Sequence, residues 1–410
     1  MFIYNAVLAF NSWIWGIPIL IILIGGGLYL SFITGFVQIR HFPTIIKSTV
    51  GSMFNKEEMK EETGKHHGTI SSFQAVSAAL AAVLGTGNIV GVGTAIAAGG
   101  PGAIFWMWVV GFVAMALKYS EACVSIAVRE KKPEGGYKGG ANYYLSKINK
   151  PLGFAWTIAI MYSLITAAGV HTGSVVTAAE SLGVPRLVAT IIVCIIIALI
   201  IFGGLQALVQ ITERLVPFMA AIYILAGLAV VVLNIGNLVP AIVSIFKGAF
   251  TGTAALGGFA GATVSAAIRN GCARGVYSSD AGNGQSSIAY SQSSETDPVK
   301  QGMWGIFEVF FDTIVVCTMT ALIILTPEDV WCSGESGVAL TMAAVETVIP
   351  ASISNVLVTL CIFGFCFSTV LSFYIYYETA CVSLFGEKAF KVLKWLYFIF
   401  PLVFAGYANV

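Results

Sequence analysis

Long apolar stretches recur along the chain, separated by shorter runs of charged and turn-forming residues. A helix needs about 20 apolar residues to cross the hydrocarbon core of a bilayer. Ten segments of roughly this length are predicted near 13–37, 70–97, 103–128, 152–177, 187–204, 214–234, 253–290, 301–325, 352–378 and 391–410. The seventh is the least hydrophobic of them. The pattern therefore predicts an all-α polytopic membrane protein of about ten transmembrane helices.

Composition agrees with this pattern. Hydrophobic residues make up 57% of the 410 positions, charged residues only 10%, and the mean hydropathy is +0.88. Because soluble globular chains carry about 25% charged residues, an ordinary soluble protein is excluded. The net charge of +1 argues against nucleic-acid binding, which needs a basic surface. No Lys or Arg precedes the first segment, which is also too long for a signal peptide, so we expect a true span.

The basic residues lie mostly in alternate connections between the segments. Of the 21 Lys and Arg residues, only Arg186 and Lys247 fall in even-numbered connections. Lys118 lies inside the third segment, and Arg269 and Arg274 are counted with the odd connection that follows the polar end of the seventh. Cytoplasmic loops of membrane proteins are enriched in Lys and Arg. We therefore expect the N-terminus outside, the odd connections (including the charged run 56–65) in the cytoplasm, and the chain in the cytoplasmic membrane of a prokaryote.

Cysteine and histidine usage excludes other classes. Seven of the eight cysteines lie in or beside predicted spans, only Cys332 lies in an external loop, and no C-x-x-C pair occurs. Neither a disulfide framework nor a zinc site is expected, and the thiols suit small packing groups. The four histidines do not converge on a nucleophile or base, so an intramembrane enzyme is not expected. No cofactor is predicted.

Two segments are interrupted by glycine and polar residues. The second contains Gly85-Thr86-Gly87-Asn88 at mid-membrane depth, and the seventh contains a polar run from Arg269 to Ser287. Being five segments apart, the two cross the bilayer in opposite directions. Paired interrupted segments in inverted halves indicate a transporter site made by broken helices, although the same glycines suit close helix packing. The mid-span amide of Asn88 favours the broken helix, because it needs a polar partner.

Five strings carry a resemblance to a known family. They are GTGNIVGVGTAIAAGGPGAIFWMW at 85–108, ALKYSEA at 116–122, VPFMAAIYILAGL at 216–228, FFDTIVVCT at 310–318 and FSTVLSFYIYYE at 367–378. Together they resemble the alanine or glycine:cation symporters, also called sodium:alanine symporters, over nearly the whole chain. The resemblance implies one transport domain with a LeuT-type fold: an extra N-terminal helix (13–37), a five-helix repeat (70–234) and an inverted second repeat (253–410). Because that fold needs eleven helices, the last is expected to be missing, through truncation or real shortening.

The resemblance also implies a site. The backbone at Thr86 and Gly87 would receive the substrate carboxylate, and the pocket would include Asn88, His171, Tyr277, Thr369 and Phe373. Sodium would lie between carbonyls of the second and ninth segments, with two hydroxyls added, at Ala81, Leu84, Phe365, Ser368 and Thr369. Oxygen ligands suit such a hard cation. The residues alone leave a second possibility open, in which Ser368 and Thr369 bond the carbonyl groups of their own helix.

Several positions depart from the family's usual pattern. His171 stands where the family usually has Gln, Phe373 replaces a Trp, and Ser279-Asp280 replaces Asn-Glu. These changes surround one predicted pocket, so they bear on the substrate rather than on the fold. A histidine in mid-span is a functional hypothesis by default. It could contact substrate, couple a proton, or serve as a neutral imidazole that donates the hydrogen bond made by the family's Gln.

Other intramembrane charges have simpler interpretations. Lys118 and Glu121 are three residues apart on one helix face and are expected to pair. Arg269, Arg274 and Asp280 are expected to form a gating ion-pair network, with substrate contact as the alternative. Glu308 is expected to be solvated near the cytoplasmic end of its helix. Asp312 lies deeper and has no assigned role.

The predicted function is secondary active symport, with a small neutral amino acid such as alanine or glycine imported together with sodium by alternating access. Binding of each ligand would raise the affinity for the other. Two alternatives remain: a proton-coupled carrier or one for a larger substrate such as serine or glutamine, and a sensor that binds an amino acid without transporting it. The expected partners are the amino acid, sodium and the lipid bilayer.

Overall fold

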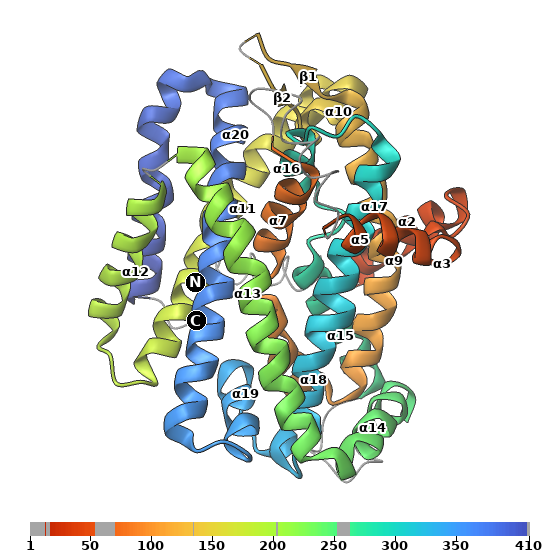
Figure 1. Ribbon diagram of the computed structural model, residues 1–410, viewed down its shortest axis with the longest axis vertical. Coiled ribbons are helices and arrows are strands. Elements are labelled where there is room, and N and C mark those ends of the chain that lie inside the picture. The colour runs from red at the N-terminus through yellow and green to blue at the C-terminus, as the bar shows by residue number, and fades with distance from the viewer. Residues whose placement is uncertain are drawn as a thin grey trace.

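The computed structural model describes residue 13 and residues 17–53, 70–133, 135–201, 204–251 and 263–407 (Figure 1). The charged run 56–65, the start of the seventh segment and the last three residues lie outside this range. Within it the regular secondary structure is helical, apart from a hairpin in which β1 (Glu130–Lys131) pairs antiparallel with β2 (Tyr137–Lys138) and one isolated bridge.

The long helices have the length and apolar character of membrane spans. Among the described residues, five helices could cross a membrane, or six if one bent pair counts as a single span. They are α9 (Gly102–Val128), α11 (Lys150–Glu180), α13 (Gly204–Leu233), the run of α17 (Pro298–Val309), η4 (Phe310–Val316) and α18 (Cys317–Leu325), and α20 (Ala351–Tyr407), with the bent pair α7 (Ser72–Val83) and η1–α8 (Gly87–Gly91, Val92–Gly99). The predicted class of a helical polytopic membrane protein is confirmed, whereas the number ten stays a prediction.

Shorter helices complete the described chain. They are α2 (Ile17–Ile33), α3 (Val37–Arg40), α4 (Phe42–Ser48), α5 (Val50–Met53), α10 (Ala141–Ile148), α12 (Arg186–Ile201), η2 (Ile235–Asn237), α14 (Leu238–Thr251), α15 (Val264–Ser279), α16 (Ser286–Ser291), η5 (Val330–Cys332) and α19 (Gly337–Glu346). Several of them, such as α10, α14 and α19, lie where the hydropathy pattern predicted connections. Packing explains α14, because Trp106 Nε1 donates to the carbonyl of Ala249 at 3.2 Å and so ties α14 to α9.

Two segment boundaries also differ from the expectation. The predicted connection 205–213 is part of α13, and the last two predicted segments share α20. Within α20, Gly386 has φ 75° and ψ 169°, which interrupts the helix between the two segments. Glycine adopts positive φ at little cost, so it can turn the chain there without a longer loop. In the sequence, the charged residues of both stretches marked them as connections, although the structure shows both within helices.

The two interrupted segments run in opposite directions, as predicted. Ile70, just before α7, pairs with the chain after α16, and Ser294 N donates to Ile70 O at 2.7 Å. At the other end, a Cβ on Gly99 of α8 would lie 3.2 Å from Cα of Ala267 in α15. The first interrupted element, α7–η1–α8, is therefore antiparallel to the second, α15–α16.

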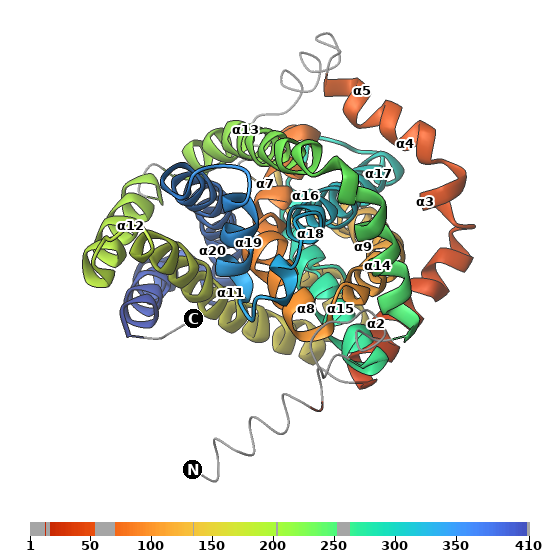
Figure 2. The same ribbon diagram turned by 90° about the horizontal axis from the view of Figure 1, so that it is seen from below.

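Both interrupted elements lie in the interior of the bundle. Figure 2 shows α7 and α16 near the centre, with α12 at one edge and α2 to α5 at the opposite edge. The peripheral helices expose large apolar side chains, such as Ile21 at 65% and Leu199 at 69%, which suits contact with lipid. Since lipid cannot satisfy backbone groups freed by a helix break, the breaks need this enclosure.

Candidate functional site

The first helix break lies where three helices cross. Helix α7 ends at Val83, the ψ of 87° at Leu84 is not helical, and the chain resumes in the π-helical turn η1 after a bend of 48°. A Cβ on Gly85 would lie 2.5 Å from His171 Cε1 in α11 and 2.7 Å from Thr369 Oγ1 in α20. Glycine is therefore required at the break because no side chain fits between these helices.

Asn88 stabilises the break through hydrogen bonds of its side-chain amide. Its Oδ1 accepts a hydrogen bond from the backbone N–H of Gly85 at 3.0 Å, and its Nδ2 donates to Asp312 Oδ1 at 2.7 Å. Ser278 Oγ donates to the other carboxylate oxygen of Asp312 at 2.8 Å. The amide has the polar partners that its mid-span position demanded. The interrupted segments thus meet through Asp312, a residue that the sequence marked only as a buried charge.

His171 contacts the freed backbone directly. Its Nδ1 lies 3.3 Å from the backbone nitrogen of Thr86, which donates the hydrogen bond, and its ring meets that of Phe373 edge-on with centroids 5.6 Å apart. An accepting Nδ1 carries no proton, so this contact suits a neutral imidazole. One of the three alternatives left open by the sequence was a neutral imidazole that donates, as the family's Gln would, whereas in this contact the ring accepts. It also occupies the Thr86 N–H that was assigned to a substrate carboxylate.

The predicted cation ligands gather at the junction of α7 and α20. Thr369 Oγ1 lies 3.1 Å from the carbonyl oxygen of Leu84 and 2.9 Å from that of Phe365, and Ser368 Oγ donates to Phe365 O at 2.8 Å. Ala81 is buried in the last turns of α7. Both hydroxyls thus bond a carbonyl of their own helix, the alternative left open by the sequence. Thr369 brings three oxygen atoms together, its own hydroxyl and the carbonyls of Leu84 and Phe365, and such oxygens suit a hard cation.

A cavity of about 360 Å³ lies beside the break, within the range of small-molecule sites. Four of the predicted substrate residues line it, namely Gly87, His171, Tyr277 and Phe373. Three others do not line it: Thr86 contacts the lining residues His171 and Tyr277, whereas the hydrogen-bond partners of Asn88 and Thr369 lie behind the lining. The hydroxyl groups of Thr86 and Tyr277 lie 3.1 Å apart, which joins the first break to α15 at the edge of the cavity.

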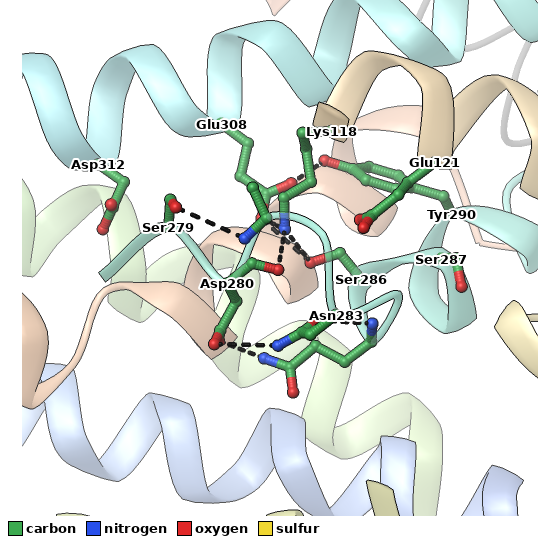
Figure 3. Close-up of polar contacts among 12 residues, drawn as sticks. Lys118, Glu121, Ser279, Asp280, Asn283, Ser286, Ser287, Tyr290, Glu308 and Asp312 are labelled. Atoms are coloured by element: carbon green, nitrogen blue, oxygen red, sulfur yellow. Dashed lines mark hydrogen bonds and ion pairs between the residues drawn. The ribbon is translucent and has the colours of Figure 1, made fainter. Parts of the chain in front are cut away.

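The second break, the loop between α15 and α16, is held by a buried ion pair that the sequence did not predict. Lys118 Nζ lies 3.3 Å from Glu308 Oε1, and both side chains are fully buried. Lys118 also donates to Ser286 Oγ at 2.9 Å and to the carbonyl oxygen of Asp280 at 3.3 Å, and the Tyr290 hydroxyl donates to Glu308 (Figure 3). The expected pairing of Lys118 with Glu121 is wrong, as is the expected solvation of Glu308. Helix packing places α17 against the face of α9 that carries Lys118.

Glu121 binds backbone instead of a lysine. Its Oε1 accepts from the N–H groups of Gly282 at 2.8 Å and Gly284 at 3.2 Å, both in the loop between α15 and α16. Both glycines have positive φ, at 92° and 80°, which frees these N–H groups from helical bonding. A carboxylate that accepts only can satisfy both donors. This explains why Glu121 faces the break.

The expected gating network of Arg269, Arg274 and Asp280 is absent among the described residues. No ion pair there joins either arginine to Asp280, and the Arg274 guanidinium lies 6.0 Å from the ring centroid of Tyr277. Asp280 directly follows α15 with φ 49° and accepts hydrogen bonds from the side-chain amides of Asn283, at 3.2 Å, and Gln285. The arginines belong to helix α15, whereas Asp280 turns into the loop that follows.

Comparison with known proteins identifies the family of this chain. A sequence model described as the sodium:alanine symporter family matches residues 1–410. The chain belongs to this family. An uncharacterized transporter of Haemophilus influenzae is 39% identical over 97% of the chain and 86% of its own length. The sodium/alanine symporter AgcS of Methanococcus maripaludis is 38% identical over 94% of the chain and 84% of its own length.

Membership of the sodium:alanine symporter family makes this chain a transporter rather than an enzyme, with sodium as the co-transported ion. It supports amino-acid and cation symport as the activity. The relatives also include a probable sodium/glutamine symporter of Bacillus subtilis, GlnT, which is 33% identical over 90% of the chain and 75% of its own length. Family membership therefore supports the transport class but leaves more than one amino acid as substrate.

Proposed function

We propose that this symporter imports a small neutral amino acid, alanine or glycine in size, together with sodium across the cytoplasmic membrane of a prokaryote. The observation that carries the proposal is the break at Leu84–Thr86, which interrupts a buried helix beside a cavity of about 360 Å³. The N-terminus lies outside, a placement supported by the uneven distribution of Lys and Arg among the connections. In alternating access, the repeats at 70–234 and 253–410 would move relative to each other. The antiparallel arrangement of the two interrupted elements supports this division into inverted repeats.

Two groups of residues would bind the transported species. The amino acid lies against Gly87, His171, Tyr277 and Phe373, with Thr86, Asn88 and Thr369 behind them. Sodium binds among oxygens of Ala81, Leu84, Phe365, Ser368 and Thr369. Thr369 Oγ1 contacts Leu84 O and lies next to Gly85. A cation bound by Thr369 therefore stabilises the same break that borders the cavity. This shared element is the physical basis for coupling.

Uptake into proteoliposomes tests the proposal. The purified protein is reconstituted, and uptake of labelled glycine, alanine, serine and glutamine is measured with an inward sodium gradient, with potassium in its place, and after an ionophore has collapsed the gradient. Sodium-driven accumulation of alanine or glycine is expected. If no amino acid moves faster with the sodium gradient, the proposal fails. Sodium-dependent binding without uptake would instead indicate a sensor.

A larger substrate is the second candidate, supported by the edge-on pair of His171 and Phe373 in the cavity wall. Phe occupies less volume than the Trp usual at this place in the family, which leaves room for a longer side chain. Counterflow with the same labelled panel distinguishes the two candidates. Serine or glutamine exchanging faster than alanine would favour the larger substrate, and exchange that proceeds without sodium but depends on pH would favour proton coupling.

A further inference from the structure

The Asp280 carboxylate lies at the wall of the cavity without a basic partner. Asp280 is a lining residue, and its oxygens accept from the amides of Asn283 and Gln285, which are neutral. In Figure 3 its carboxylate points away from Lys118, which contacts its backbone carbonyl instead. Among the described residues no ion pair neutralises this carboxylate. Asp280 is half-buried, and a carboxylate partly withdrawn from water favours a cationic ligand, because an unpaired charge is costly there.

Helix ends strengthen the attraction for a cation. Helix α15 ends at Ser279, directly before Asp280, and helix α7 ends at Val83, which also lines the cavity. The C-terminal end of a helix carries a partial negative charge and favours cations. Gly87 starts η1 at the same cavity, so the opposite partial charge lies close by. The cavity thus offers separate places for the two charges of a zwitterion.

Lys118 and Glu121 hold Asp280 in position without neutralising it. Lys118 donates to the carbonyl oxygen of Asp280 at 3.3 Å, while its charge is matched by the ion pair with Glu308. Glu121 accepts from the N–H groups of Gly282 and Gly284, which follow Asp280 in the loop. Contacts from α9 therefore restrain the loop at Asp280 and on its C-terminal side. The side chain of Asp280 is left to face the cavity.

We infer that Asp280 binds the ammonium group of the transported amino acid, with Lys118 and Glu121 as positioning residues. This inference rests on the proposed function and adds to it the group that recognises the substrate's positive end. It assigns Asp280 to substrate binding rather than to a gate. Amino acids are then selected by an amine on the α-carbon, and an analogue with a hydroxyl in its place, such as lactate, competes poorly.

The test compares Asp280→Asn, Asp280→Gly and Asp280→Glu in proteoliposomes with L-[³H]alanine, and with L-[³H]glutamine if that is the better substrate of the unaltered protein. Asn and Gly both tolerate the positive φ of this position, so folding is expected to survive. Asp329→Asn is the matched control, an exposed aspartate with φ 55° outside the cavity. Binding of ²²Na⁺ without amino acid is measured in parallel.

For Asp280→Asn and Asp280→Gly, KM is expected to rise about tenfold to a hundredfold, as loss of a charged hydrogen bond implies. Maximal velocity and ²²Na⁺ binding should change less than about twofold. Asp280→Glu should recover part of the affinity, and lactate should not displace alanine from the unaltered protein. Lys118→Arg should keep KM closer to that of the unaltered protein than Lys118→Met does.

Two outcomes would overturn the inference. An unchanged KM in both carboxylate-removing variants shows that Asp280 does not bind the amine. Loss of ²²Na⁺ binding in the absence of amino acid assigns Asp280 to the cation instead. Either result leaves the proposed symport intact, because the unaltered protein still accumulates amino acid with sodium. Absence of sodium-driven uptake by the unaltered protein, by contrast, removes the proposed function itself.

Discussion

Removing Lys118 should destabilise the protein strongly, because it leaves a buried carboxylate without its cation. The ammonium lies 3.3 Å from Glu308 Oε1, and neither side chain is exposed. Breaking one partner of a buried ion pair costs about 3–5 kcal/mol. Lys118→Met and Glu308→Gln should each lose stability in this range. The double variant should be closer to the unaltered protein, because no unpaired charge remains.

The double variant should not recover completely. Lys118 also donates to Ser286 Oγ at 2.9 Å and to Asp280 O at 3.3 Å, and each such hydrogen bond contributes about 1 kcal/mol. Subtracting these two hydrogen bonds from the cost of a single replacement gives a coupling energy of about 1–3 kcal/mol for the pair in a double-mutant cycle. This coupling energy is the part that comes from the attraction between the charges of Lys118 and Glu308.

Unfolding in detergent–SDS mixtures, followed by circular dichroism, measures the four free energies. The control is the cycle for Lys138 and Glu130, whose charged atoms lie 3.2 Å apart but whose side chains are 46% and 55% exposed. That pair should contribute about 0–1 kcal/mol. If Lys118→Met costs no more than Lys138→Met, or if the double variant is no more stable than either single one, burial of the ion pair does not determine its energy.

Three further predictions concern the first break. Gly85→Ala should abolish uptake and cost about 1–3 kcal/mol, since the new Cβ would lie 2.5 Å from His171 Cε1. Gly25→Ala, where no atom lies within 4 Å, should leave uptake and melting temperature unchanged. Asn88→Ala should cost about 1–3 kcal/mol per orphaned group in the same SDS assay, because Gly85 N–H loses its acceptor and Asp312 a donor; equal stability would contradict this. His171→Ala should raise KM for the transported amino acid about tenfold, worth ~1.4 kcal/mol, and unchanged uptake kinetics would exclude substrate contact.

The sequence by itself determined the class, most of the long spans and the place of the first break. Hydropathy is a local property, and a bilayer demands about 20 apolar residues wherever a helix crosses it. Likewise, Gly85 and Asn88 mark a break because a helix rich in glycine with a mid-span amide needs polar partners. These signals lie within one segment, so no knowledge of neighbouring helices is required. The five family strings added the symport activity, which the comparisons then supported.

Only the tertiary structure decided which polar groups meet. Lys118 has a carboxylate three residues away in sequence, yet it pairs with Glu308, which is 190 positions distant, because α17 packs against its side of α9. Asp312 became part of the site only when η4 was placed beside Asn88. Asp280 was expected in a gating ion-pair network, whereas the structure places it in the wall of the cavity. A buried charge must find a partner in whatever surrounds it, and that surrounding is set by helix packing rather than by neighbours along the chain.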